Sequence, residues 1–97
     1  MSTPVDVTAC DNELIVIATQ WALSSEVFRI KSGNGNAVSY SVDLASILPS
    51  GAYDLTMIGV NWGGPFNFAL TVDGAGYGNS GSGGAGISWT QTISITV

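Results

Sequence analysis

Alternation between apolar and polar residues is the feature that most limits what this chain can fold into, and it is clearest in residues 53–72. In the second half of that stretch every second residue is large and apolar, namely Phe66, Phe68, Leu70 and Val72. A period of two residues is typical of a β-strand that buries one face. Gly63 and Gly64 allow the positive φ angles of a tight reversal, and Pro65, which lacks an amide hydrogen, suits the start of a strand. The stretch therefore predicts two apolar strands joined at a tight corner that contains Trp62.

Similar short runs recur along the rest of the chain. We predict further strands at residues 5–10, 13–19, 26–31, 38–43 and 87–97. Residues 14–17 are all apolar, which indicates a strand that is central in its sheet or covered on both faces. An Asn-Gly pair within residues 32–36 predicts a β-hairpin between the third and fourth strands. One short helical turn is expected at residues 44–50, with Asp43 as its N-cap.

The last quarter of the chain contains two contrasting segments. Residues 74–86 include seven glycines in thirteen residues and predict a long Gly-rich loop, without a phosphate-binding or dinucleotide-binding motif. Residues 87–97 predict a long strand in one register, with Trp89 facing the core and a row of serines and threonines facing outward.

These elements define the expected fold class. A chain of 97 residues fits a single domain. About seven strands separated by turns, without a long helix, predict an all-β, single-domain antiparallel β-sandwich of jelly-roll or Ig-like type, with a small barrel as the second choice.

Composition excludes several classes of partner. Only 9% of residues are charged, against about 25% in a typical domain, and the net charge is −5 with two basic residues. Nucleic acids and anionic membranes are therefore not expected as partners. The sequence has no transmembrane segment and no visible signal peptide, which leaves a cytoplasmic location, leaderless secretion or removal of a leader. The single cysteine, Cys10, cannot form an internal disulfide, although it permits an intermolecular one.

The usual catalytic residues are missing. There is no histidine, one cysteine rules out the usual zinc sites, and the spacing of the seven acids selects no catalytic pair. We therefore predict a non-enzymatic protein without a cofactor. Calcium is not excluded, because residues 11–13, or Asp73 with Asn79, could form partial sites, although these acids are more typical of solvated turns.

Aromatic and amide residues gather around the predicted loops. Sugar sites combine an aromatic ring with amide and carboxylate groups that bind hydroxyls. The sequence therefore predicts a lectin-like, carbohydrate-binding site formed by Trp62, Asn61, Asn67, Asp73 and Tyr77. The alternative is that Trp62 fills the core, as we expect for Trp89.

The predicted last strand carries no charged residue, although charges usually discourage pairing between the edges of sheets. We therefore expect a homo-oligomer. The alternative function is a structural self-assembling protein, such as a fibre, inclusion or particle subunit, without a small ligand.

Overall fold

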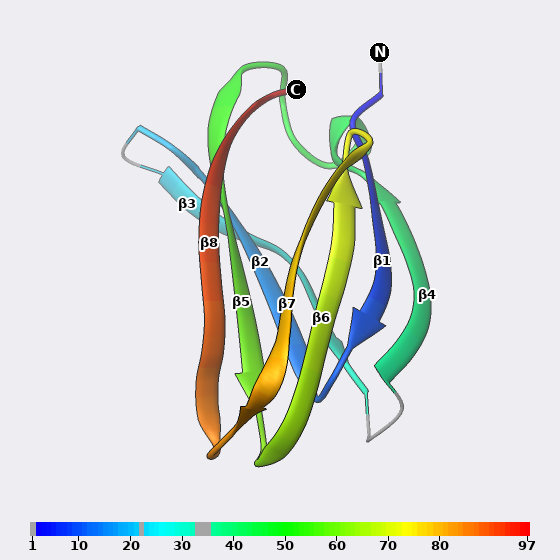
Figure 1. Ribbon diagram of the computed structural model, residues 1–97. Coiled ribbons are helices and arrows are strands. Elements are labelled where there is room, and N and C mark those ends of the chain that lie inside the picture. Colours follow the sequence, from blue (N-terminus) through cyan, green and yellow to red (C-terminus); the bar gives the residue numbers. More distant parts are fainter. Residues whose placement is uncertain (1, 22, 33–35) are drawn as a thin grey trace.

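Two four-stranded antiparallel sheets face each other in the computed structural model, which describes residues 2–21, 23–32 and 36–97 (Figure 1). The strands are β1 (Pro4–Cys10), β2 (Glu13–Gln20), β3 (Leu23–Lys31), β4 (Asn36–Asp43), β5 (Ala52–Asn61), β6 (Gly64–Val72), β7 (Ala75–Gly83) and β8 (Gly86–Thr96). Sheet A has the order β4-β1-β6-β7, and sheet B has the order β3-β2-β5-β8. The predicted all-β sandwich is confirmed, with eight strands rather than about seven.

Each central strand buries every second side chain, as the alternation predicts. The core contains residues of both sheets, including Val5, Val7, Leu14, Val16, Leu55, Met57, Phe68 and Leu70. The run at residues 14–17 is central in sheet B, where β2 pairs with β3 and β5. Its outward residues Ile15 and Ile17 are only half-buried.

Most connections carry the chain from one sheet to the other. The chain changes sheet between β1 and β2, β3 and β4, β4 and β5, β5 and β6, and β7 and β8 (Figure 1). The hairpin predicted at residues 32–36 is therefore wrong, because β4 pairs with β1 and not with β3. Residues 33–35 themselves lie outside the described residues. The corner after β5 is tight as expected, with φ of 123° at Gly63 and 88° at Gly64, and it too crosses between the sheets.

The predicted helical turn is present as a 3-10 helix, η1 (Leu44–Ser46). The Asp43 carboxylate accepts hydrogen bonds from the backbone amides of Ala45 at 3.0 Å and Thr3 at 2.8 Å. The cap thus joins η1 to the start of β1. Among the described residues, no helix is long and apolar enough to cross a membrane.

The loop predicted at residues 74–86 is wrong, because β7 occupies most of it. β7 pairs with β6 along its whole length, from Val72 opposite Ala75 to Gly64 opposite Gly83. A Cβ atom at Gly78 would overlap the carbonyl oxygen of Phe68. Glycine has a weak intrinsic preference for strands, but here it allows a close approach that larger residues would prevent.

The last strand has the predicted length but not one register. A bulge lies opposite Gly59 and Val60, where Gly59 pairs with Trp89 and Val60 with Ile87. The bulge turns Ile87 outward, and its side chain is 67% exposed. Trp89 is buried as predicted, with its ring stacked 6.1 Å from that of Phe68 at an interplanar angle of 19°.

Phe68 from sheet A fills the space beside Gly59 of sheet B. A Cβ atom at Gly59 would lie 2.7 Å from the Phe68 ring. The ring of Phe68 is therefore the reason that this position of β5 carries no side chain.

We predict that Gly59→Ala lowers the free energy of unfolding by about 1–3 kcal/mol, because a methyl group overpacks this point. In a Phe68→Leu background the same change should be smaller by about 1 kcal/mol, because leucine leaves room for the methyl group. Urea denaturation of the four proteins in this double-mutant cycle measures the coupling. Equal effects of Gly59→Ala in both backgrounds would contradict the proposed contact.

Candidate functional site

The five residues predicted as a sugar site do not come together. Asn61 and Trp62 precede the nine-residue β6, and Asp73 follows it, so they lie at opposite ends of the sandwich, roughly 25–30 Å apart. Asn67 is exposed on the outer face of sheet A. Only Asp73 and Tyr77 share a cavity, of about 320 Å³, beside β8.

Asn61 has a structural role. Its side chain is fully buried, and Nδ2 donates hydrogen bonds to the carbonyl oxygens of Gly64 at 2.9 Å and Gly83 at 3.3 Å. These bonds join the corner after β5 to the end of β7. A side chain buried in this way cannot face a ligand on the surface.

Trp62 lies at the surface, with 56% of its area exposed, so it does not fill the core. Its backbone amide donates a 2.7 Å hydrogen bond to Oδ1 of Asn12. Asn12 and Asp11 are buried, which corrects the expectation that these are solvated turn residues. Across the described residues, no three His, Cys, Asp or Glu side chains are close enough to hold a metal ion.

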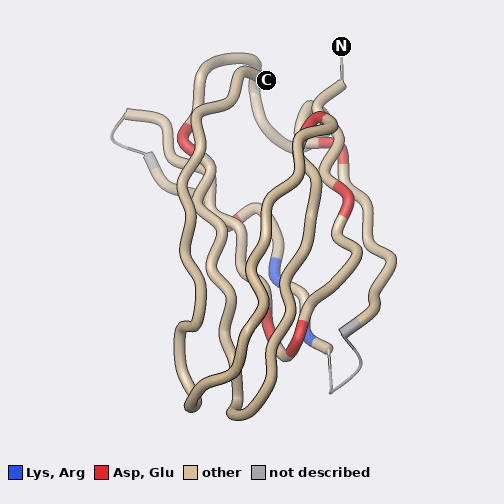
Figure 2. Tube along the Cα trace, in the orientation of Figure 1, with Lys and Arg blue, Asp and Glu red and all other residues tan. Residues whose placement is uncertain are grey.

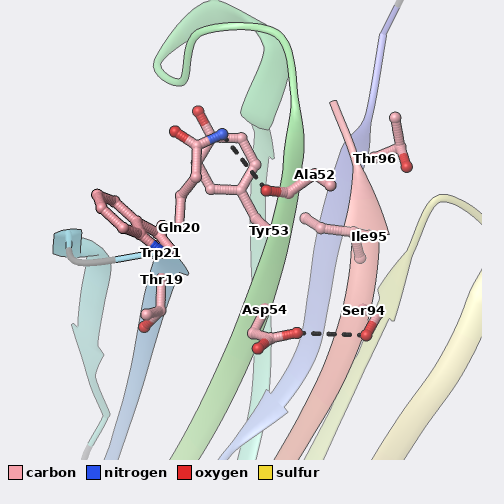
Figure 3. A pocket seen from close by; sticks show the side chains of 9 residues that line it. All are labelled: Thr19, Gln20, Trp21, Ala52, Tyr53, Asp54, Ser94, Ile95 and Thr96. Carbon is pink, nitrogen blue, oxygen red and sulfur yellow. Dashed lines mark hydrogen bonds between the residues drawn. The ribbon is translucent and has the colours of Figure 1, made fainter.

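A different group of residues forms a shallow depression of about 280 Å³ on the outer face of sheet B (Figure 3). Strand pairing places Thr19 of β2, Asp54 of β5 and Ser94 of β8 in one row across the sheet. The Ser94 hydroxyl donates a 3.2 Å hydrogen bond to the Asp54 carboxylate. The other lining residues are Gln20, Trp21, Ala52, Tyr53, Ile95 and Thr96.

Trp21 stands at one side of this depression, beside Thr19 (Figure 3). It is 98% exposed and has a φ of 49°, a left-handed conformation that is rare for a bulky residue. Trp21 follows Gln20, which pairs with Leu23, so Trp21 lies where the chain reverses between β2 and β3 and where Asn or Gly would be favoured. Both the exposed ring and the backbone conformation are unfavourable, and such features concentrate at functional sites.

Hydrogen bonds hold the floor of the depression in place. Gln20 Nε2 donates to the Ala52 carbonyl oxygen at 3.4 Å, and the Tyr53 hydroxyl donates to the Pro49 carbonyl oxygen at 2.7 Å. Asp54 supplies the one carboxylate among the described lining residues. The site therefore combines an exposed indole, a positioned carboxylate and several hydroxyl groups.

The sequence analysis missed this site because its parts are far apart in the chain. Trp21 lies in a short connection, and Asp54 and Ser94 are ordinary outward positions of two strands until pairing sets them side by side. A tryptophan where the chain reverses between two strands is the one sequence signal that points to it. Comparison of the chain with protein-family models, curated proteins and solved structures gave no match.

The only cysteine is not part of the depression. Cys10 is fully buried, with Sγ 3.9 Å from the carbonyl oxygen of Ile30. Burial, reinforced by the nearby charges of Asp11 and Glu13, raises the pKa of the Cys10 thiol from 9.0 to about 11. The thiol is therefore neutral at pH 7, and the buried sulfur is not placed for an intermolecular disulfide.

We predict that stability falls in alkali because of Cys10. Below pH 9.0 the thiol is protonated in both the folded and the unfolded protein, so it makes its full contribution to the free energy of unfolding. That contribution is lost as the pH rises to about 11, because the unfolded thiol then ionises more readily than the folded one. The loss should be roughly 2–3 kcal/mol relative to Cys10→Ala, measured by urea denaturation across that range. If the free energies of unfolding of the two proteins change with pH in parallel, the thiol does not titrate as described.

Trp21→Asn should raise the free energy of unfolding by about 1 kcal/mol, because asparagine tolerates the left-handed conformation and the exposed ring contributes little packing. Trp21→Phe is the matched control, since it keeps the backbone strain and should leave stability unchanged. Urea denaturation measures both, and a loss of stability in Trp21→Asn would mean that the ring supports the fold.

Proposed function

We propose that the protein is a non-enzymatic carbohydrate-recognition module that binds a sugar of one or two rings in the Trp21 depression. The main support for this proposal is that an exposed indole and the hydrogen-bonded Asp54–Ser94 pair line the same depression. The proposed ligand class, a carbohydrate, is the one that the sequence predicts, but the residues of the proposed site are different ones.

The chemistry of the site suits a sugar. An indole face offers a flat apolar surface for the C–H side of a pyranose ring, and an ionised carboxylate accepts hydrogen bonds from hydroxyl groups. Thr19, Ser94 and Thr96 add hydroxyls that both donate and accept. A volume of about 280 Å³ lies at the low end for ligand sites, which favours a short sugar.

The same residues argue against glycosidic cleavage. Most glycosidases require two carboxylates about 5–9.5 Å apart, and Asp54 is the single carboxylate that lines the depression among the described residues. A site with one carboxylate and a stacking ring supports binding without turnover.

Titration with a panel of monosaccharides and disaccharides, followed by calorimetry and tryptophan emission, tests the proposal. We expect millimolar binding to at least one sugar. Trp21→Ala should abolish binding, and Asp54→Asn should weaken it by about tenfold or more, because hydrogen bonds to a charged group are strong.

Trp62→Ala is the matched control, because Trp62 is also an exposed tryptophan but lies outside the depression. It should bind sugar as the wild type does. The proposal fails if no sugar in the panel binds at 10 mM, a concentration about tenfold above a millimolar dissociation constant. It also fails if Trp62→Ala removes binding while Trp21→Ala retains it.

A further inference from the structure

The strand β8 is a long, uncharged edge of sheet B. It pairs with β5 on one side only, and its other side has no neighbour among the described strands. Residues 74–97 contain no charged side chain, and the tubes of β7 and β8 carry neither red nor blue in Figure 2. A charged residue of the neighbouring strand β5, Asp54, pairs with Ser94 of β8. An edge strand presents unpaired amide and carbonyl groups to any second strand of suitable register.

The other edges are less suited to pairing. β3 carries Glu26, Arg29 and Lys31, and Arg29 forms a 2.9 Å ion pair with Glu26. Charged side chains on an edge discourage edge-to-edge pairing. β4 ends at Asp43, and its pairing with β1 is interrupted by a register shift. β7 is also uncharged, but its glycines favour strand pairing weakly.

The segment Thr90–Thr96 of β8 has the regularity that pairing needs. It pairs with β5 without a register shift, and its residues alternate between exposed hydroxyl side chains and half-buried ones. The half-buried isoleucines Ile93 and Ile95 lie in the sheet that faces β7, whose one large apolar residue is Tyr77. Apolar surface at this edge is therefore still open to a partner.

We propose that β8 is the surface through which a second copy of this chain binds, by antiparallel pairing with the same strand of that copy. The alternating sequence of β8 is self-complementary around Ile93. A two-fold axis at this residue sets Thr92 opposite the partner's Ser94, and Thr90 opposite the partner's Thr96. Sheet B of one copy and sheet B of the other then form one continuous sheet. Neither β8 strand carries a charged side chain, and the Asp54 carboxylates that accept hydrogen bonds from Ser94 lie on β5, one strand back from the shared edge. The net charge of −5 on each chain therefore creates no close repulsion between the paired strands.

Sedimentation equilibrium of the intact chain and three variants tests the pairing without any sugar, so its outcome is independent of the proposed function. We expect the wild type at twice the monomer mass of 9.9 kDa. Thr92→Lys and Thr92→Glu should each sediment as monomers, because two like charges then lie diagonally across the axis, about 7–8 Å apart. Ser39→Lys, which places the same charge on exposed β4, should remain dimeric.

Mixing provides a second measurement that a folding defect would not imitate. Equal amounts of Thr92→Lys and Thr92→Glu should form mixed dimers, because the diagonal charges are now opposite. A wild type that is monomeric at about 1 mM, a weak limit for specific association, would overturn the proposal. It would also be overturned by a dimeric Thr92→Lys protein, or by a mixture that stays monomeric.

Discussion

The Phe68 ring of sheet A packs directly against Gly59 of sheet B, and this contact constrains the residues around it. Phe68 is among the largest fully buried side chains, and it reaches sheet B at a point where β5 has no side chain. Trp89 then stacks on the same ring, although its strand must bulge beside it. On the other side, the Phe68 carbonyl oxygen requires a glycine at position 78. The ring of Phe68 thus explains the glycine in β5, and its backbone carbonyl oxygen explains the glycine in β7.

Sequence periodicity was sufficient for most strands, because burial of one face imposes alternation wherever a sheet covers a core. It failed at β7, where glycines carry no side-chain pattern and the strand exists through its pairing with β6. It also failed for the connection after β3, since an Asn-Gly pair describes a local turn and cannot report that β4 pairs with β1. Positions of strands were thus predictable, but the assignment of strands to sheets depends on contacts between distant residues.

The difference between proximity in the chain and proximity through strand pairing also explains why the predicted site residues are not those that line the depression. Proximity in the chain suggested a site formed by Trp62 and its neighbours. However, the nine residues of β6 place the two ends of that strand apart by most of the length of the sandwich. The row that lines the depression comes instead from three strands that only pairing makes adjacent. Asn61 is a polar residue near a loop whose role is structural. Its side chain donates hydrogen bonds to the backbone at the corner after β5 and at the end of β7. Trp21 combines an exposed ring with a left-handed backbone conformation that is rare for a bulky residue.

Ser94 and Thr96 belong both to the wall of the depression and to the free edge of sheet B. A strand added at this edge would extend the row of Thr19, Asp54 and Ser94 by one more hydroxyl. Under the two proposals, the same two residues contact both the ligand and the added strand, so the two equilibria are linked if pairing alters their contacts with the ligand. If pairing changes the affinity for a ligand by some factor, the ligand changes the affinity of pairing by the same factor. If the proposed pairing and the proposed binding are coupled in this way, the oligomeric state of the protein depends on ligand concentration.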